Sequence, residues 1–375
     1  MSGPEQLLSE LIALPSVNPA FLPAGHPHAG EQRVADYLGA LLAQAGLEVE
    51  WQTVFDGRSN LLARLEPKAK VRRRIWLVPH LDTVNGTDEQ FRPAKRNGRL
   101  FGRGACDTKG SVAAMASAVM QLATSPSRPR ETEILFAGVV DEENAQAGSR
   151  FLAGSGSKAD LAIIGEPTRL QVVTAHKGSL WLRYETRGKS AHGARPELGR
   201  NAVHEMARAV DLLETEYAVA LKKRKHELLG SPTVNVGLIT GGTQPNIVPD
   251  RCTIEVDRRT LPGETQATVK REILVLLSRR NISATPSSAK AAPCWPMQTD
   301  PKHPLVANLL RCFRQAKPAG VDYFCDAAIL SRAGIPSVVF GPGDIAQAHT
   351  GNEWIALPQL REAAAMLLKF LRSLP

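Results

Sequence analysis

The stretch Ile75-Trp76-Leu77-Val78-Pro79-His80-Leu81-Asp82 joins a short apolar run to polar residues at its end. The same pattern recurs later in the chain: the apolar runs 134–140, 161–164 and 337–340 lead into Asp141-Glu142-Glu143, Gly165-Glu166 and a glycine-rich turn before His349. Continuous apolar runs of this length are typical of strands buried on both faces of a mostly parallel sheet. The pattern therefore predicts an α/β domain built on such a sheet.

Helical periodicity surrounds these runs. Apolar residues recur at helical spacing, and Pro or Gly bounds several of the segments, in the stretches 5–14, 30–45, 111–123, 304–315 and 358–373. Helices in these places would cover the sheet, as an α/β fold requires.

The middle of the chain has a different order. Strand-like pieces at 179–186, 233–239 and 252–256 flank two helical stretches, at about 201–229 and 264–279. This order is typical of a small ferredoxin-like α+β domain. We expect a main domain of residues 1–178 and 295–375, interrupted by an inserted domain of residues 179–294.

Length and charge agree with two domains. A chain of 375 residues exceeds the size at which one hydrophobic core usually suffices. The net charge is +9, and the segment 179–294 holds 18 Lys and Arg against 12 Asp and Glu. Its densest basic run, 222–225, is interpreted as a solvated helix end. Aromatic residues make up only 5% of the chain, and no nucleic-acid-binding module is recognisable, so nucleic acid is not expected as a partner.

Targeting signals are not apparent in the sequence. No stretch approaches the roughly 18 apolar residues of a membrane span, so no membrane partner is expected. The first residues show no signal-peptide pattern. The five cysteines are scattered and have no CxxC spacing, which favours free thiols. Together these features predict a cytoplasmic protein.

The polar residues after the apolar runs predict a metal site. Ligands of open α/β sheets bind beyond the carboxyl ends of the strands. Three adjacent acids, residues 141–143, would repel one another unless cations neutralise them. Imidazole and carboxylate groups are ligands for zinc, cobalt or manganese. Asp82 lies on the same side of an extended segment as His80 and can accept a hydrogen bond from its ring.

These residues carry a resemblance to a known family. The motifs occur in order: His80-Leu81-Asp82-Thr83-Val84, Gly102-Arg103-Gly104-Ala105-Cys106-Asp107-Thr108-Lys109-Gly110, Asp141-Glu142-Glu143, Gly165-Glu166-Pro167-Thr168, Gly188-Lys189-Ser190-Ala191-His192 and Ala348-His349-Thr350. Together they resemble the co-catalytic di-zinc deacylases and exopeptidases, which include acetylornithine deacetylase, succinyl-diaminopimelate desuccinylase, aminoacylases and glutamate carboxypeptidases. The resemblance implies a catalytic main domain and an inserted lid or dimerisation domain.

By this resemblance, two divalent ions, Zn²⁺ or Co²⁺, share Asp107 as a bridging ligand. His80 and Glu166 complete one site, and Glu143 and His349 the other. Glu142 is then the general base of amide hydrolysis. The resemblance also implies a cis peptide bond between Asp107 and Thr108.

The inserted domain supplies further expected residues. His192 matches the family histidine that reaches the oxyanion across a homodimer. Asn246 and Arg259 match positions that bind the substrate carboxylate, although the sequence leaves open whether Arg258 or Arg259 faces the site. The segment Gly351-Asn352-Glu353-Trp354 departs from a more usual Asp-Glu-Tyr ending.

The expected activity is metal-dependent hydrolysis of the amide bond of N-acyl-L-amino acids, and the stretch Val339-Phe340-Gly341-Pro342-Gly343 most resembles the acetylornithine deacetylase branch. A succinyl-diaminopimelate desuccinylase and a dipeptidase or carboxypeptidase-type exopeptidase are the alternatives within the class. A catalytically inactive binding protein is the remote alternative. The preferred acyl group and side chain depend on pocket shape and do not follow from the sequence.

Overall fold

The computed structural model describes residues 3–289, 292 and 294–375. The chain forms two compact units. The first contains residues 1–174, 298–319 and 325–375, and the second contains residues 175–297 and 320–324. The predicted insertion, 179–294, falls inside the second unit, and its residues 290, 291 and 293 lie outside the described part.

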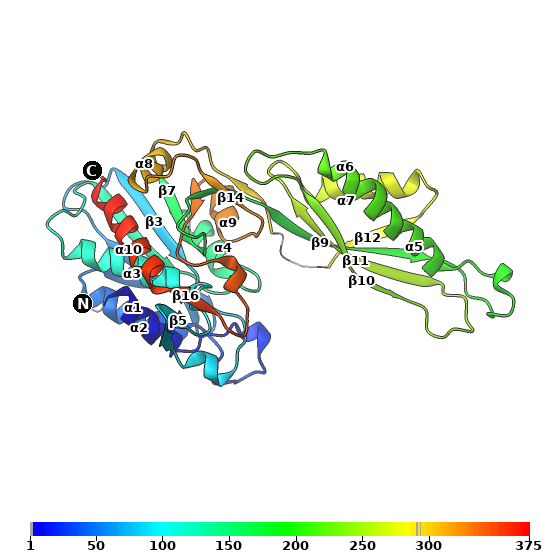
Figure 1. The fold of residues 1–375 in the computed structure, drawn as a ribbon, viewed down its shortest axis with the longest axis horizontal. Helices are drawn as coiled ribbons and strands as arrows, with labels where there is room; N and C mark the ends of the chain where they lie inside the picture. Colours follow the sequence, from blue (N-terminus) through cyan, green and yellow to red (C-terminus); the bar gives the residue numbers. More distant parts are fainter. Residues whose placement is uncertain (1–2, 290–291, 293) are drawn as a thin grey trace. The chain divides into compact units, whose positions relative to one another are not determined.

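A large mixed sheet forms the centre of the first unit (Figure 1). Its strands follow the order β1-β2-β6-β3-β7-β15-β8-β13, and β14 pairs with β8. The pairs β6–β3, β3–β7 and β7–β15 are parallel, whereas β1–β2, β2–β6 and β15–β8 are antiparallel. The strands are β1 (Glu48–Phe55), β2 (Arg58–Leu65), β3 (Arg73–Pro79), β6 (Thr132–Gly138), β7 (Leu161–Gly165), β8 (Val173–His176), β13 (Met297–Gln298), β14 (Ala319–Val321) and β15 (Ser337–Val339).

The predicted buried strands are confirmed. The apolar runs that begin at Ile75, Ile134, Leu161 and Ser337 form β3, β6, β7 and β15. All seven residues of β6 and all five of β7 are buried, because helices cover both faces of the sheet here. The carboxyl ends of β3, β6 and β7 therefore meet at one edge.

Helices lie on both sides of the large sheet. One hydrophobic core joins the sheet to α1 (Pro4–Ile12), α2 (Gln32–Gln44), α3 (Lys109–Ala123), α8 (Pro304–Cys312) and α10 (Leu357–Arg372). On the other face, α4 (Ala147–Gly154) packs against β1 and β2, and α9 (Ala327–Arg332) against β15 and β7. The predicted helix over 304–315 ends at Cys312, since Arg314 has a φ of 56° and turns the chain.

A small three-stranded sheet completes the first unit. Its order is β16 (Trp354–Ala356), β5 (Arg99–Phe101) and β4 (Ala94–Arg96), all antiparallel. The pairing sets Trp354 opposite Phe101. It thereby brings the chain before Trp354 next to the glycine-rich loop that follows Phe101.

The second unit has the strand–helix–strand–strand–helix–strand order of a ferredoxin-like domain, as expected, although its last strand, Ala284–Ser288, lies outside the three predicted strand pieces. Its antiparallel sheet, ordered β10-β11-β9-β12, consists of β9 (Gly178–Arg187), β10 (Thr233–Gly241), β11 (Arg251–Thr260) and β12 (Ala284–Ser288). Its helices are α5 (Ala202–Leu212), a π-helical turn (Leu213–Tyr217), α6 (Ala218–Lys222) and α7 (Gln266–Ser278). Buried side chains from β9 and β11 meet those of α5 and α7 in a separate core. This arrangement is an α+β fold of ferredoxin-like order.

The helix predicted over 201–229 is wrong at its C-terminal end. It stops at Lys222, and the chain then forms a tight turn in which His226 and Gly230 exchange backbone hydrogen bonds. Three of the four residues in the basic run 222–225 are exposed at this helix end. Arg224 in this run forms ion pairs with Glu264 at 2.8 Å and Glu272 at 3.0 Å, so contacts with another part of the chain hold the residues that follow the helix.

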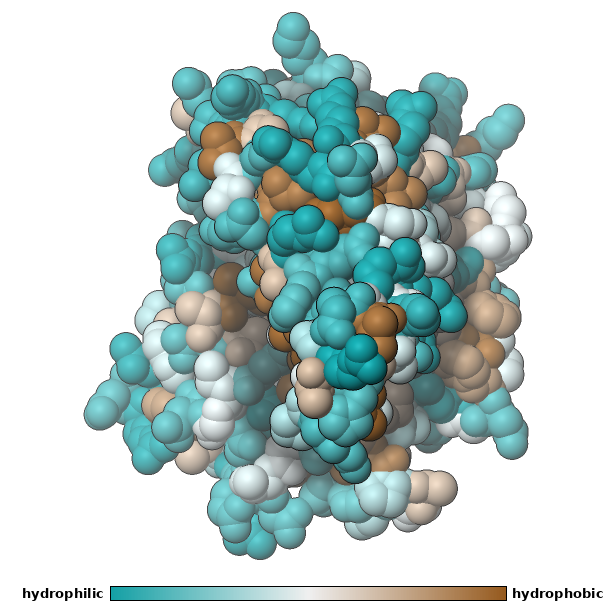
Figure 2. Space-filling model, turned by 90° about the vertical axis from the view of Figure 1, so that its right-hand side faces the viewer, coloured by the Kyte–Doolittle hydropathy of each residue, from teal (hydrophilic) through white to brown (hydrophobic). Residues whose placement is uncertain are grey.

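No helix in the described part of the chain is long and apolar enough to cross a membrane. The face of the molecule shown in Figure 2 is mostly hydrophilic, with small hydrophobic patches between polar side chains.

His176 offers a test of the packing in the second unit. Its ring is fully buried next to the small apolar cluster of Ala175, Leu229 and Leu261. Its Nδ1 lies 2.8 Å from the Lys177 carbonyl oxygen, and no other described group bonds to Nε2. Burial lowers the pKa of His176 from 6.5 to about 4, against the opposing effect of the Lys177 carbonyl.

Because the unfolded chain binds this proton more tightly, the contribution of His176 to stability is complete above pH 6.5 and decreases as the pH falls toward 4. Between pH 7.5 and pH 5 we expect the free energy of unfolding of wild type to fall by about 2 kcal/mol more than that of His176→Gln. Urea unfolding of both metal-free proteins at the two pH values measures this difference. Equal losses would contradict the burial of a neutral ring.

Candidate functional site

The predicted polar residues converge at the carboxyl edge of the large sheet. His80 directly follows β3, and Glu166 directly follows β7. Glu142 and Glu143 lie just beyond β6, and Asp107 comes shortly before α3. The register sets His80 opposite Val139, so the ends of β3 and β6 stay level.

Asp107 lies between two histidines. Its Oδ1 is 3.1 Å from Nε2 of His80, and its Oδ2 is 3.3 Å from Nε2 of His349. Each histidine has a second carboxylate neighbour: Glu166 Oε1 lies 3.8 Å from His80, and Glu143 Oε2 lies 3.1 Å from His349. The side chain of His80 is 1% exposed and that of His349 is 53% exposed. The cluster is therefore open to solvent on the side of His349.

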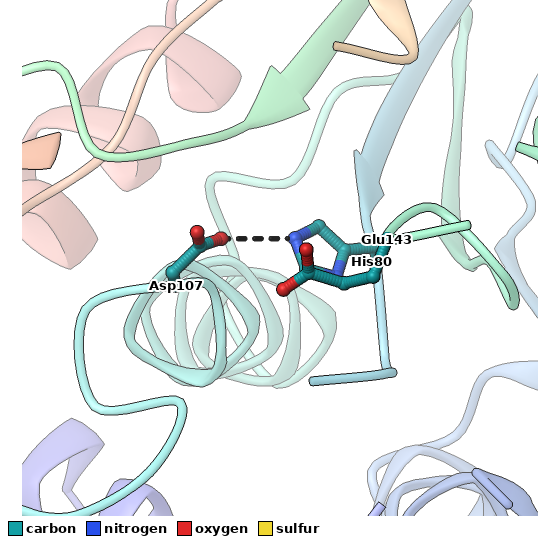
Figure 3. A group of neighbouring side chains, drawn as sticks. All are labelled: His80, Asp107 and Glu143. Atoms are coloured by element: carbon teal, nitrogen blue, oxygen red, sulfur yellow. Dashed lines mark hydrogen bonds and ion pairs between the residues drawn. The ribbon is translucent and has the colours of Figure 1, made fainter. Parts of the chain in front are cut away.

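Figure 3 shows the inner part of this cluster, in which the Asp107 carboxylate points to the ring of His80. Two sets of side chains could each hold an ion, because the possible ligand atoms within each set all lie within 4.8 Å of one another. One set is His80 with Asp107 and Glu143, and the other is His80 with Glu142 and Glu166. Nitrogen and carboxylate oxygen atoms at this spacing suit a divalent transition metal.

The titration behaviour of the cluster reflects its crowding. Burial raises the pKa of Glu142 and Glu166, and neighbouring carboxylates raise it further. Burial acts on Asp107 in the same direction, but hydrogen bonds from His349 and His80 outweigh it and lower its pKa. Bonds to Asp107 and Glu143 raise the pKa of His349 to about 10. The site thus stabilises positive charge among its carboxylates, as a cation site must.

Asp82 lies behind the cluster and holds three of its members. Its Oδ1 and Oδ2 accept hydrogen bonds from the backbone N–H groups of Glu142 and Glu143, both at 3.1 Å. The ring Nδ1 of His80 is 3.0 Å from the Asp82 carbonyl oxygen and 3.4 Å from its carboxylate. The predicted contact between Asp82 and His80 is therefore present, with the backbone oxygen as the nearer acceptor.

The peptide bond between Asp107 and Thr108 is cis, which confirms the expectation. The Thr108 hydroxyl donates to the carbonyl oxygen of Gly165, at 2.7 Å. This bond ties the start of α3 to the end of β7, next to Glu166.

Comparison with known proteins identifies the family. Residues 76–373 match the peptidase family M20/M25/M40. The chain belongs to this family. It is 31% identical over 349 residues to an acetylornithine deacetylase from Myxococcus xanthus, covering 89% of this chain and 90% of the relative. It is 28% identical over 367 residues to a probable succinyl-diaminopimelate desuccinylase from Staphylococcus epidermidis, covering 87% and 88%.

Solved structures agree on the fold. The crystal structure of aminopeptidase PepT from Bacillus cereus ATCC 10987 matches with a TM-score of 0.79 and 21% identity, over 98% of this chain and 97% of that chain. The family membership and the relatives together make this M20 family member a hydrolase of the deacylase or peptidase type.

Glu353 belongs to the site of this M20 family member, and sequence reasoning treated it only as part of a variant motif. Its carboxylate accepts hydrogen bonds from the backbone N–H groups of Gly104, Cys106 and Asp107, at 2.9–3.1 Å, and from Arg103 at 2.7 Å. Glu353 is 2% exposed. A buried carboxylate that accepts four bonds fixes the loop carrying Asp107. The only feature of the sequence that pointed to Glu353 was its place three residues beyond the His349-Thr350 pair.

Asp326 is a second residue that the sequence did not reveal. It is buried and accepts hydrogen bonds from the Ser149 hydroxyl at 2.6 Å and the Gln146 amide at 3.2 Å. Burial raises its pKa to about 6. It follows no apolar run of the type found before the other acids, so the sequence pattern gave no signal for it.

The residues predicted from the inserted domain lie in the second unit. His192 forms a backbone bridge with Ile247, and the Gly193 N–H donates to the Asn246 carbonyl oxygen at 2.7 Å. The loops that carry His192 and Asn246 are thus paired. Arg259 lies on β11, away from both loops in sequence.

The structure separates the two adjacent arginines. Arg258 is fully buried, where it donates to Tyr217 at 3.2 Å and to Glu264 at 2.6 Å. Arg259 points to the opposite face of β11, bonds to Asp257 at 3.0 Å, and is 32% exposed at its side chain. Of the two, Arg259 is the one accessible to a ligand.

Proposed function

We propose that the protein hydrolyses the amide bond of N-acyl-L-amino acids with the help of two divalent metal ions. The observation that carries this proposal is the position of Asp107, whose two carboxylate oxygens face different histidines, each next to another glutamate. One carboxylate with its oxygens turned to two separate ligand pairs is suited to bridge two ions.

The donor set fits the proposed ions. His80, Asp107 and Glu166 would hold one ion, and His349, Asp107 and Glu143 the other. Three protein ligands to each ion leave positions open, as a catalytic zinc or cobalt site requires. When bound, the ions would polarise the scissile carbonyl and acidify water. They would also offset the burial of charge and the mutual repulsion that together raise the pKa of Glu142 and Glu166.

Glu142 is the proposed proton carrier. It lies within the His80–Glu142–Glu166 group, and its own backbone N–H is fixed by Asp82. Its raised pKa suits a group that accepts a proton from the attacking water and returns it to the leaving amine. Asp82 orients His80 and holds the backbone of both glutamates during these transfers.

The second unit supplies the proposed substrate contacts. Asn246 and Arg259 would bind the substrate carboxylate, with the fork of the guanidinium matching its two oxygens. His192 would stabilise the oxyanion of a neighbouring subunit. The basic excess of this segment, 18 Lys and Arg against 12 Asp and Glu, favours such anionic substrates.

The proposed substrate class is that of acetylornithine deacetylase, supported by the 31% identity to the relative of that name. A succinyl-diaminopimelate desuccinylase is the alternative favoured by the 28% identical relative, and a dipeptidase or carboxypeptidase is the next. An inactive binding protein is less well supported, because Glu142 and all five proposed ligands are present and adjacent.

Amine release from a panel of N-acetyl-L-amino acids, N-succinyl-amino acids and dipeptides, with added Zn²⁺ or Co²⁺, tests the function. We expect hydrolysis of N-acetyl substrates and close to two metal ions per chain. Absence of bound metal together with absence of amidase activity would contradict the proposal.

Glu142→Gln separates the base from the ligands. It should retain the metal content of wild type but lower kcat by about 10²–10⁴-fold, because the proton carrier is lost and the ligands are kept. Metal analysis and steady-state kinetics measure the two effects. Glu362→Gln, an exposed glutamate on α10, is the control and should match wild type. Loss of metal in Glu142→Gln would show that Glu142 is a metal ligand and not the base.

The two arginines give a paired test. Arg259→Met should lower kcat/KM about 10–100-fold through a raised KM, because a charge-assisted bond to the substrate carboxylate is lost. It should leave stability nearly unchanged. Arg258→Met should lower the free energy of unfolding by roughly 3 kcal/mol, because it removes the buried partner of Glu264. An unchanged KM in Arg259→Met would contradict its role.

The homodimer is proposed to form through the second unit. The strand β10 is an edge of its sheet, and its residues Leu238 and Ile239 are 61% and 55% exposed. Exposed apolar side chains on an open edge strand favour pairing with another chain. Sedimentation should give twice the chain mass, and Leu238→Asp should weaken association about 10-fold or more. Val275→Asp, an exposed position on α7, is the control. A monomeric wild type would contradict the dimer.

A further inference from the structure

The segment before the first predicted strand contributes to the site at the sheet edge. Residues 16–18 run beside residues 81–83. The Asn18 N–H donates to the Thr83 carbonyl oxygen at 2.9 Å, and the Thr83 N–H donates to the Ser16 carbonyl oxygen at 3.0 Å. The Ser16 hydroxyl donates to the Leu81 carbonyl oxygen at 2.7 Å. This segment lies outside the residues that match the family, 76–373.

Asn18 uses its side chain to join two buried carboxylates. Its Nδ2 donates to Asp82 Oδ2 at 2.8 Å and to Asp141 Oδ1 at 3.0 Å. Asn18 and Asp82 are 0% exposed, and Asp141 is 1% exposed. The amide oxygen accepts the Ala20 N–H at 3.0 Å, which fixes the orientation of the amide so that its NH₂ group faces the carboxylates.

Each of these carboxylates sets a part of the site. Asp82 accepts the N–H groups of Glu142 and Glu143 and lies against His80. Asp141 lies three residues beyond the end of β6 and has a φ of 68°, and this turn lets the next two N–H groups converge on Asp82. Asn18 thus connects the end of β3 to the end of β6.

Charge makes this connection necessary. Asp82, Asp141 and Glu31 are all buried, and Arg58 is bonded to Glu31 and Asp141. No described group bonds to Asp141 Oδ2. Without the Asn18 amide, Asp82 and Asp141 would lose the donor that they share and repel each other, and the loop with Glu142 and Glu143 would move with Asp141.

We propose that Asn18 is a positioning residue of the site: its amide clamps Asp82 to Asp141 and thereby sets the positions of Glu142, Glu143 and His80. It is neither one of the proposed metal ligands nor one of the proposed substrate contacts. Its effect on turnover rests on the proposed function, whereas its effect on the loop does not.

Asn18→Asp tests this role with the least change in shape. One carboxylate oxygen of the new aspartate can still accept the Ala20 N–H. The other replaces the NH₂ donor, so that a third carboxylate faces Asp82 and Asp141. Ser16→Ala is the matched control, because it removes a buried hydrogen bond of the same segment without touching either carboxylate. Asn18→Ser, which keeps one donor in a smaller side chain, is the second variant in case Asn18→Asp does not fold.

Hydrogen exchange of the metal-free proteins is the first measurement. In Asn18→Asp the amides of residues 140–145 should exchange about 10-fold faster or more, with a smaller increase in Asn18→Ser, while Ser16→Ala keeps wild-type protection there. Unchanged exchange in the Asn18 variants, or an equal increase in Ser16→Ala, would overturn the proposal.

Zinc affinity by chelator competition and steady-state kinetics follow. Asn18→Asp should bind Zn²⁺ about 10–100-fold more weakly than wild type, as expected for a residue that supports metal ligands. At saturating metal its kcat should fall by a similar factor with KM within about twofold of wild type. A raised KM with unchanged kcat would overturn the proposal. If wild type itself binds no metal and hydrolyses no amide, the proposed function fails, and the exchange comparison still decides the role of Asn18.

Discussion

Negative charge buried at one edge of a sheet is the constraint on which the rest of the structure depends. Parallel strands bring their carboxyl ends together, so the acids that follow β3, β6 and β7 have to share one small region. Burial, and to a smaller extent their mutual repulsion, raises the pKa of Glu142 and Glu166. Such a cluster persists only where donors and cations offset the charge, and most of the polar contacts in this region serve that end.

Backbone and side-chain donors form a layer beneath the cluster. Asp82 is held by two consecutive N–H groups and by Asn18, and Glu353 is held by three N–H groups and Arg103. Each of these carboxylates is buried and bonded to backbone N–H groups of a loop that carries a residue of the site. Side chains placed in this way can meet an incoming cation with little rearrangement, which is what both metal binding and proton transfer require.

The sequence predicted the first unit well because its signals are local. Each apolar run of β3, β6, β7 and β15 is continuous, and the polar residue at its end follows within a few positions. The helix predicted to reach residue 229 ended at Lys222, and the turn of His226 and Gly230 and the ion pairs of Arg224 that hold the following residues are not part of an apolar pattern. Glu353, Asp326 and Asn18 were not predicted, since their partners lie 64 to 250 residues away in the chain.

The sequence by itself determined the fold class, the buried strands β3, β6, β7 and β15, the helices α1, α2, α3, α8 and α10, and the identity of the acids and histidines at the sheet edge, because periodicity and motif spacing are local properties. Only the tertiary structure decided which of Arg258 and Arg259 is accessible, since burial depends on which face of β11 the helices cover. It also decided that Asp107 lies between two histidines and that Asn18 joins Asp82 to Asp141. Those contacts arise when strands and loops distant in sequence are packed side by side, and no local pattern encodes them.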